Sequence, residues 1–169
     1  MSPNLLELRL RECSLHELLI LTSKALTRSG FGDVQILDRR HSRQKSRHGG
    51  HELLCQTSLG TVSVSVVVKV IRDSIRVRML DELAGTVQRM KADMGLIISP
   101  FEASPKAKSK LPSYSASRIE VMDGAGLSQL LSRYHIGTCN DGEMVDWQFF
   151  ESLGDASEKV LHFLTTTRP

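Results

Sequence analysis

The chain has 169 residues, which is enough for one ordinary domain and too few for two of comfortable size. Hydrophobic residues make up 40% and charged residues 24%, a globular composition that argues against disorder or fibrous repeats. No apolar run approaches the ~20 residues of a membrane helix, and the start lacks a signal region, so we expect a cytoplasmic protein without a membrane span. The isolated cysteines Cys13, Cys55 and Cys139 argue against a disulfide framework or a zinc ribbon.

Charge is unevenly distributed along the chain. The net charge is +3, but residues 139–169 hold six acids against two cations, which leaves +7 for residues 1–138. Clustered cations attract polyanions such as nucleic acid, although a basic run can also be only a solvated loop. The cations that we consider for DNA phosphates are Arg39, Arg40, Arg43, Lys45, Arg47, Arg72, Arg76 and Arg78.

The N-terminal third predicts a helix, a strand and a basic loop. Residues 6–10 alternate leucine with charge, which suits a short edge strand, although the segment could equally be helical. Ser14 opens a clearer helix, with apolar residues at helical spacing up to Leu26 and Gly30 as its stop. Residues 34–37 read as a strand, and the serine-rich basic stretch up to Gly50 reads as a loop.

Residues 51–71 predict two strands joined by a turn at residues 58–60. Because side chains alternate along a strand, the valines at even positions 62–70 share one face, which we expect to be core. The other face is polar for most of its length and ends near Lys69.

Helices and strands alternate in the rest of the chain. This alternation predicts helices on both faces of a central, partly parallel sheet. We expect helices at about 79–93, 104–112 and 127–134, strands at 95–99 and 119–122, an aromatic tail at 147–150, and a last helical pattern through Val160, Leu161 and Leu164.

The order of these segments resembles the Mrr-type restriction endonuclease family, within the wider PD-(D/E)XK nuclease-like superfamily. The resemblance covers roughly residues 14–137. Gly49-Gly50-His51-Glu52 stands at the family's Gly-Gly-x-Asp signature, and Val67-Val68-Lys69 stands at its Gln-x-Lys or Glu-x-Lys signature. The other matching pieces are His16-Glu17-Leu18-Leu19, Gly30-Phe31, Ile97-Ile98-Ser99-Pro100-Phe101 with Ala107, and Ile119 to Gly124 with Leu127.

The resemblance implies an α/β fold of the restriction endonuclease type, with a mixed central sheet flanked by helices on both faces. It divides the chain into an N-terminal extension or edge strand (1–13), a nuclease-fold domain (14–137) and an acidic C-terminal extension packed on the same domain (138–169). It also implies catalytic roles for Glu52, Lys69 and Glu17, with Glu52 as ligand of Mg²⁺ or Mn²⁺. Phosphodiester hydrolysis needs such a metal, a deprotonated water and a cation beside the developing charge.

The sequence departs from the family pattern at two positions. Glu52 replaces aspartate and adds one methylene, and Val67 replaces a residue that could ligate the metal. A carboxylate from elsewhere could fill the empty ligand position, either Asp81 or Glu82 from the next helix or Glu17 from the first one. Glu17 also has an alternative role, because it stands three residues after Ser14, as in a capping box.

Two classes of function remain open at this stage. The first is a DNA-interacting protein with a degenerate or marginal nuclease site, which would cleave DNA with Mg²⁺ or Mn²⁺. The second is a module that has kept the fold and lost the chemistry, and that binds DNA or a protein. Residues 6–10, if they form an edge strand, could pair two copies into a homodimer.

Overall fold

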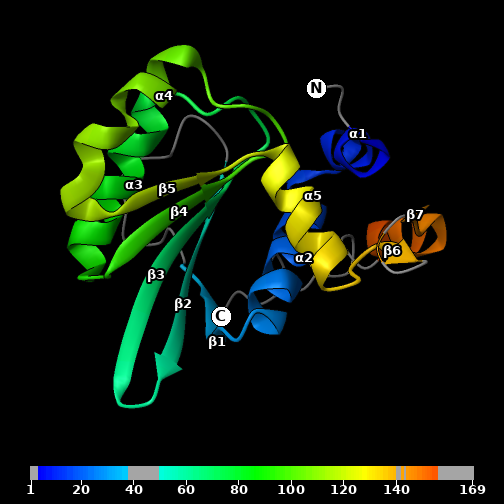
Figure 1. Ribbon diagram of the computed structural model, residues 1–169, viewed down its shortest axis with the longest axis horizontal. Helices are drawn as coiled ribbons and strands as arrows, with labels where there is room; N and C mark the ends of the chain where they lie inside the picture. The colour runs from blue at the N-terminus through cyan, green and yellow to red at the C-terminus, as the bar shows by residue number, and fades with distance from the viewer. Residues whose placement is uncertain (1–3, 38–49, 140–141, 143, 156–169) are drawn as a thin grey trace, which may run out of the picture.

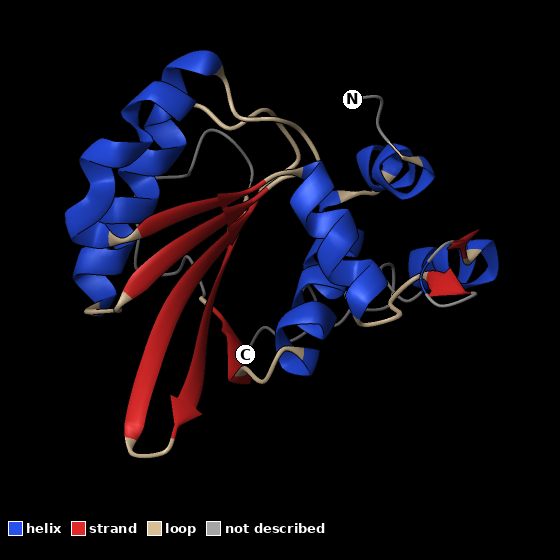
Figure 2. Ribbon diagram, viewed as in Figure 1, coloured by secondary structure: helices blue, strands red, loops and turns tan. Residues whose placement is uncertain are grey.

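Five strands form one mixed sheet in the order β1-β2-β3-β4-β5 (Figures 1 and 2). The computed structural model describes residues 4–37, 50–139, 142 and 144–155. Strands β1, β2 and β3 are antiparallel neighbours, whereas β3, β4 and β5 run parallel. The strands are β1 (Gly32–Ile36), β2 (His51–Leu59), β3 (Val62–Val70), β4 (Met94–Ile98) and β5 (Ile119–Met122).

Helices cover both faces of this sheet (Figure 1). On one face lie α1 (Leu5–Glu12), α2 (Leu15–Arg28) and α5 (Gly124–Arg133), and on the other lie α3 (Val77–Met90), α4 (Pro105–Lys110) and the 3₁₀ turn η2 (Leu111–Ser117). Each face has its own hydrophobic core, one under α2 and α5 and the other under α3. The expectation of an α/β fold with helices on both faces is therefore confirmed.

The β2–β3 hairpin contributes to both cores. Val66, Val68 and Val70 pack under α2 and α5, whereas Val67 and Ile71 are fully buried under α3. The expectation of one pure core face is wrong at the start of β3, where Val62 is 60% exposed. The physical reason is that the tip of the hairpin projects beyond the helices, so no layer covers it (Figure 1).

Residues 5–12 form helix α1, so the expected edge strand at residues 6–10 is wrong and the helical alternative is the one observed. The helix begins with a capping box between Asn4 and Glu7. Leu6 and Leu10, four residues apart, are buried, and Leu8 between them points outward. Because this segment is helical, it offers no strand edge for pairing two copies.

The chain after α5 packs against the α1 side of the molecule. It contains the short strands β6 (Thr138–Cys139) and β7 (Met144–Val145), followed by helical residues 147–155. Phe150 is buried in the core and Trp147 is half exposed. The basic loop around residues 39–47 and the helical pattern expected at residues 160–164 lie outside the described residues. None of the described helices has the length and apolar character to cross a membrane.

Gly95 tests the packing of α3 on β4. A Cβ atom at this position would lie 2.7 Å from Ile119 Cδ1 and 2.9 Å from Val87 Cγ2. We therefore expect Gly95→Ala to destabilise the protein by about 1–3 kcal/mol in urea unfolding, through overpacking. The control is Gly85→Ala on α3, where the nearest atom is the end of Arg89 at 3.4 Å. That change should stabilise by about 0.5–1 kcal/mol, and equal effects of the two variants would contradict this packing.

Candidate active site

Glu52 and Lys69 face each other directly across the β2–β3 hairpin. Their Cα atoms are register partners in the antiparallel ladder, so both side chains leave the sheet on the same face. That face is the one covered by α3, because Val67 and Ile71, which flank Lys69 in alternation, belong to the α3 core. Lys69 Nζ lies 3.1 Å from Glu52 Oε1.

The ammonium group of Lys69 also binds a carboxylate from α3. Lys69 Nζ lies 3.2 Å from Glu82 Oε2, so the ammonium sits between two carboxylates. The Lys69 side chain is only 2% exposed, whereas those of Glu52 and Glu82 are 22% and 27% exposed. Burying an ammonium is costly unless it is paired, and here the two carboxylates pair it while their own outer sides remain accessible to water.

Further polar side chains on α3 extend this cluster at both ends. Arg78 Nε lies 3.3 Å from Glu82 Oε1, an ion pair between residues one turn apart. Thr86, which is 4% exposed, lies with its hydroxyl 3.4 Å from Glu52 Oε2. Arg89 donates to the Thr86 hydroxyl at 2.7 Å. Thr86 and Arg89 were not among the residues expected at the site, although their spacing of four and seven residues from Glu82 places them on the same face of α3.

Val67 contributes packing at the position where the family carries a ligand. Its side chain is fully buried in the α3 core, two residues before Lys69 on the same face. An isopropyl group offers no lone pair, so a metal ion finds no donor at this position. Within the described part of the chain, no group of three or more His, Cys, Asp or Glu side chains could hold a metal ion.

The structure places Glu17 in a capping box rather than beside Lys69. The Glu17 carboxylate accepts a hydrogen bond from the Ser14 backbone N–H at 2.6 Å, and the Ser14 hydroxyl accepts one from the Glu17 N–H. Glu17 therefore caps α2, on the opposite face of the sheet from Lys69. Its capping geometry agrees with the structural alternative considered from the sequence.

The three arginines that follow β3 differ in their surroundings. Arg72 donates from Nε to the Cys13 carbonyl at 2.7 Å, so its side chain holds the end of α1. Arg76 and Arg78 are 62% and 60% exposed at the start of α3, each in an ion pair with a nearby acid. Arg72 is exposed as well, but its guanidinium donates to the Cys13 and Arg11 carbonyls, and of the three only Arg78 contacts Glu82.

Asp81, next to Glu82 in the sequence, points elsewhere. Its carboxylate accepts a hydrogen bond from the Tyr114 hydroxyl on η2. This hydrogen bond is the main reason why the pKa of Tyr114 is raised to about 12. Asp81 thus fastens η2 to α3 and is absent from the hydrogen bonds of Lys69.

The described residues that flank the basic stretch, Leu37 and Gly50, lie near Glu52 in the structure. The Leu37 N–H donates to the Glu52 carbonyl at 2.9 Å, and Gly50 stands two residues before Glu52. A Cβ at Gly50 would lie 2.8 Å from the Val70 carbonyl, so the backbone passes close to the end of β3. The basic residues Arg39, Arg40, Arg43, Lys45 and Arg47 belong to the stretch 38–49 between Leu37 and Gly50, which lies outside the described residues.

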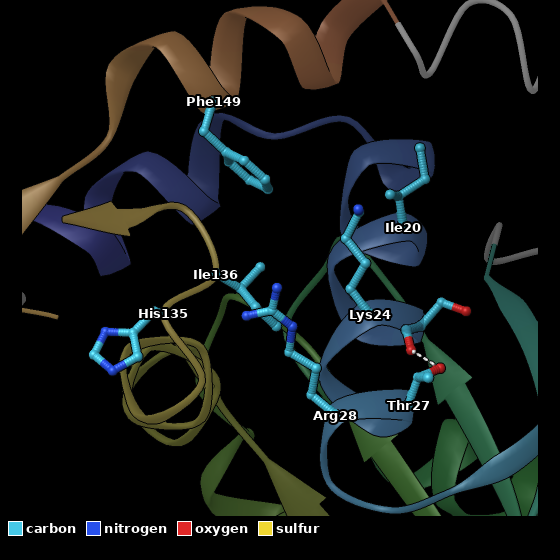
Figure 3. Close-up of a pocket in the computed structure, with 8 residues that line it drawn as sticks. Ile20, Lys24, Thr27, Arg28, His135, Ile136 and Phe149 are labelled. Atoms are coloured by element: carbon cyan, nitrogen blue, oxygen red, sulfur yellow. Dashed lines mark hydrogen bonds between the residues drawn. The ribbon is translucent and has the colours of Figure 1, made fainter. Parts of the chain in front are cut away.

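A cavity of about 430 Å³ lies on the other face of the sheet, between α2, the segment after α5, and Phe149 (Figure 3). Its lining includes Lys24 and Arg28, and Arg28 donates to the Tyr134 carbonyl at the end of α5. None of its lining residues belongs to the Glu52–Lys69–Glu82 cluster. The cavity and the Glu52–Lys69–Glu82 cluster are therefore two separate sites on the molecule.

A family model described as restriction endonuclease (Mrr_cat) matches residues 10–131. The chain therefore belongs to this restriction endonuclease family, and the resemblance drawn from the order of the segments over residues 14–137 is confirmed at the level of the family. No curated protein matches the chain at a significant level.

Two solved structures match the chain. The DNA modification-dependent restriction endonuclease AspBHI matches with a TM-score of 0.59 at 11% identity, over 94% of this chain and 41% of that one. The MspJI restriction endonuclease, in complex with a 27-mer oligonucleotide, matches with a TM-score of 0.48 at 14% identity, over 89% of this chain and 33% of that one. The chain thus spans less than half the length of these two restriction endonucleases.

The burial of the Lys69 ammonium predicts how removal of its partners changes the free energy of unfolding. Replacing both acids, in the double variant Glu52→Ala with Glu82→Ala, leaves the Lys69 charge buried and unpaired, which should cost about 3–5 kcal/mol. Lys69→Met should cost clearly less, because the two partly exposed carboxylates can turn to water. Urea unfolding measures both. A larger loss for Lys69→Met than for the double variant would contradict this account of the cluster.

Proposed function

We propose that this chain is the nuclease domain of a DNA-interacting protein, with Glu52 and Lys69 at its catalytic centre and Mg²⁺ or Mn²⁺ as cofactor. The observation that supports this most is the direct pairing of Glu52 with Lys69 across β2 and β3, in a member of a restriction endonuclease family. A carboxylate opposite a lysine on one sheet face brings together a metal ligand and a cation for the developing charge.

The residues present fit a hard divalent cation. Glu52 and Glu82 offer carboxylate oxygens that are partly open to solvent, and Mg²⁺ is commonly held by one or two carboxylates together with waters and substrate phosphates. When bound, such an ion polarises the phosphate and lowers the pKa of an attacking water. Glu52 would hold the ion, and Lys69 would stabilise negative charge on the phosphate oxygens.

The cations around the site are suited to DNA phosphates. The sequence that follows Leu37, whose N–H bonds the Glu52 carbonyl, contains Arg39, Arg40, Arg43, Lys45 and Arg47. Arg76 and Arg78 are exposed at the start of α3. Phosphate contacts position DNA without reading its sequence, so these residues supply affinity rather than specificity. Arg72 is not included, because its guanidinium holds the end of α1.

Val67 favours a second candidate function. Because the family's ligand position is filled by a buried apolar side chain, the domain could have kept DNA binding and lost hydrolysis. This second candidate is a catalytically inactive DNA-binding module, with the same cationic surface and no metal chemistry.

Salt dependence tests the DNA contacts. Binding to a DNA duplex should weaken steeply as salt rises, with a slope of about −0.9 in log K against log salt for each phosphate neutralised. Replacing the five cations of residues 39–47 by glutamine should flatten this slope. A control replaces two surface cations away from that stretch, Lys106 and Lys110 on α4, by glutamine and should leave the slope unchanged. Salt-independent binding, or no binding, would contradict a phosphate-contacting surface.

Cleavage separates the two candidate functions. Plasmid DNA incubated with Mg²⁺ or Mn²⁺ should be nicked or linearised, and Lys69→Ala should slow this by about 100-fold or more because a charge-stabilising donor is lost. Lys106→Ala serves as the control for general loss of positive charge. DNA binding without cleavage under either metal would support the inactive module and overturn the catalytic proposal.

A further inference from the structure

The loss of a ligand at position 67 cannot be repaired from β3 itself. Val67 is fully buried, and its neighbours on the same face of β3 are Lys69 and Ser65, which has no carboxylate and hydrogen-bonds Asp93. Any second carboxylate ligand must therefore come from an element packed on this face. Within the described residues, the hydrogen bonds and ion pairs of Lys69 identify which element that is.

Glu82 is the acid that the fold brings to this place. Of the three candidates considered from the sequence, Glu17 caps α2 and Asp81 binds the Tyr114 hydroxyl. Glu82 instead lies 3.2 Å from the Lys69 ammonium, which Glu52 contacts from the other strand at 3.1 Å. Its carboxylate is 27% exposed, so a hydrated ion can reach it.

We propose that Glu82 supplies the second carboxylate ligand of the metal site, in place of the residue lost at Val67, and that the ion binds by displacing the Lys69 ammonium from between Glu52 and Glu82. This inference rests on the proposed function, since it assigns the ligand set of that same site. On this proposal the Lys69 side chain has two positions. In the free protein its ammonium pairs with the two carboxylates, and with the metal bound it is directed at the phosphate.

Distances and charge both make the ammonium and the metal competitors. The carboxylate oxygens now lie at hydrogen-bond distance from Nζ, whereas Mg²⁺ holds its oxygens at about 2.0–2.1 Å. The same oxygens cannot satisfy both cations in one place. Arg78 pairs with the other carboxylate oxygen of Glu82, Oε1, so two monovalent cations already balance the two carboxylate charges. A divalent cation competes with the ammonium through its stronger Coulomb attraction to each carboxylate.

Binding of Mn²⁺ to the full chain without DNA tests this assignment. Titration followed by electron paramagnetic resonance of free Mn²⁺, or by calorimetry, gives the affinity directly and needs no catalysis. Glu82→Gln should weaken binding by about tenfold or more, and so should Glu52→Gln, because each removes a charged ligand. Asp81→Asn is the matched control, an adjacent acid on α3 with another partner, and should leave the affinity unchanged.

Lys69→Met gives an independent readout that a purely structural ion pair would not produce. Removing the competing ammonium should tighten Mn²⁺ binding by at least about fivefold. The combined variant Lys69→Met with Glu82→Gln should lose that gain. Circular dichroism shows that each variant is folded, and the glutamine at position 82 keeps an oxygen acceptor for Lys69.

Each outcome has a definite meaning. Loss of affinity in Glu82→Gln together with a gain in Lys69→Met supports the proposal. Mn²⁺ binding that depends on Glu52 but not on Glu82, or the absence of binding at millimolar Mn²⁺, overturns it. DNA binding by the wild-type chain in the absence of metal, measured in parallel, reports separately on the DNA interaction, so a failure of the ligand assignment is distinguished from a failure of the proposed function.

Discussion

The candidate site depends on one interaction, the pairing of a buried ammonium with two carboxylates from different elements. Lys69 is 2% exposed, and an ammonium without partners at such a position would cost several kcal/mol. Glu52 on β2 and Glu82 on α3 supply these partners. The hairpin and the helix are therefore joined at this point by charge as well as by the apolar core beneath α3. The carboxylates of Glu52 and Glu82, which offset this cost, are also the groups that could bind a metal ion.

Much of the fold follows from local patterns in the sequence. The β2–β3 hairpin, the apolar face of α3 and the alternation of strands and helices were all predictable, because each is encoded by spacing within one segment. The choice between strand and helix at residues 6–10 stayed open, because the alternating leucines fit a strand and the burial of Leu6 and Leu10 on one helix face depends on tertiary packing. The exposure of Val62 could not be foreseen, because it depends on how far the helices reach along the hairpin.

The candidate site, too, has a part that could be predicted from the sequence and a part that could not. The pairing of Glu52 with Lys69 follows from hairpin register, so a sequence comparison could bring the two residues together. The choice among Glu17, Asp81 and Glu82 could not be made from sequence, because it depends on which sheet face α2 covers and on the rotation of α3 about its axis. Arg72 shows the same limit, since its role at the end of α1 depends on a contact between residues 59 positions apart.

The most direct test is a crystal structure of the full chain with Mn²⁺, in which anomalous scattering locates the ion. The account predicts a peak in contact with Glu52 and Glu82, with the Lys69 ammonium turned away from both carboxylates. A map without a peak at this site, with Lys69 still bound between the two acids, would contradict the view that this charge cluster is a metal-dependent catalytic centre.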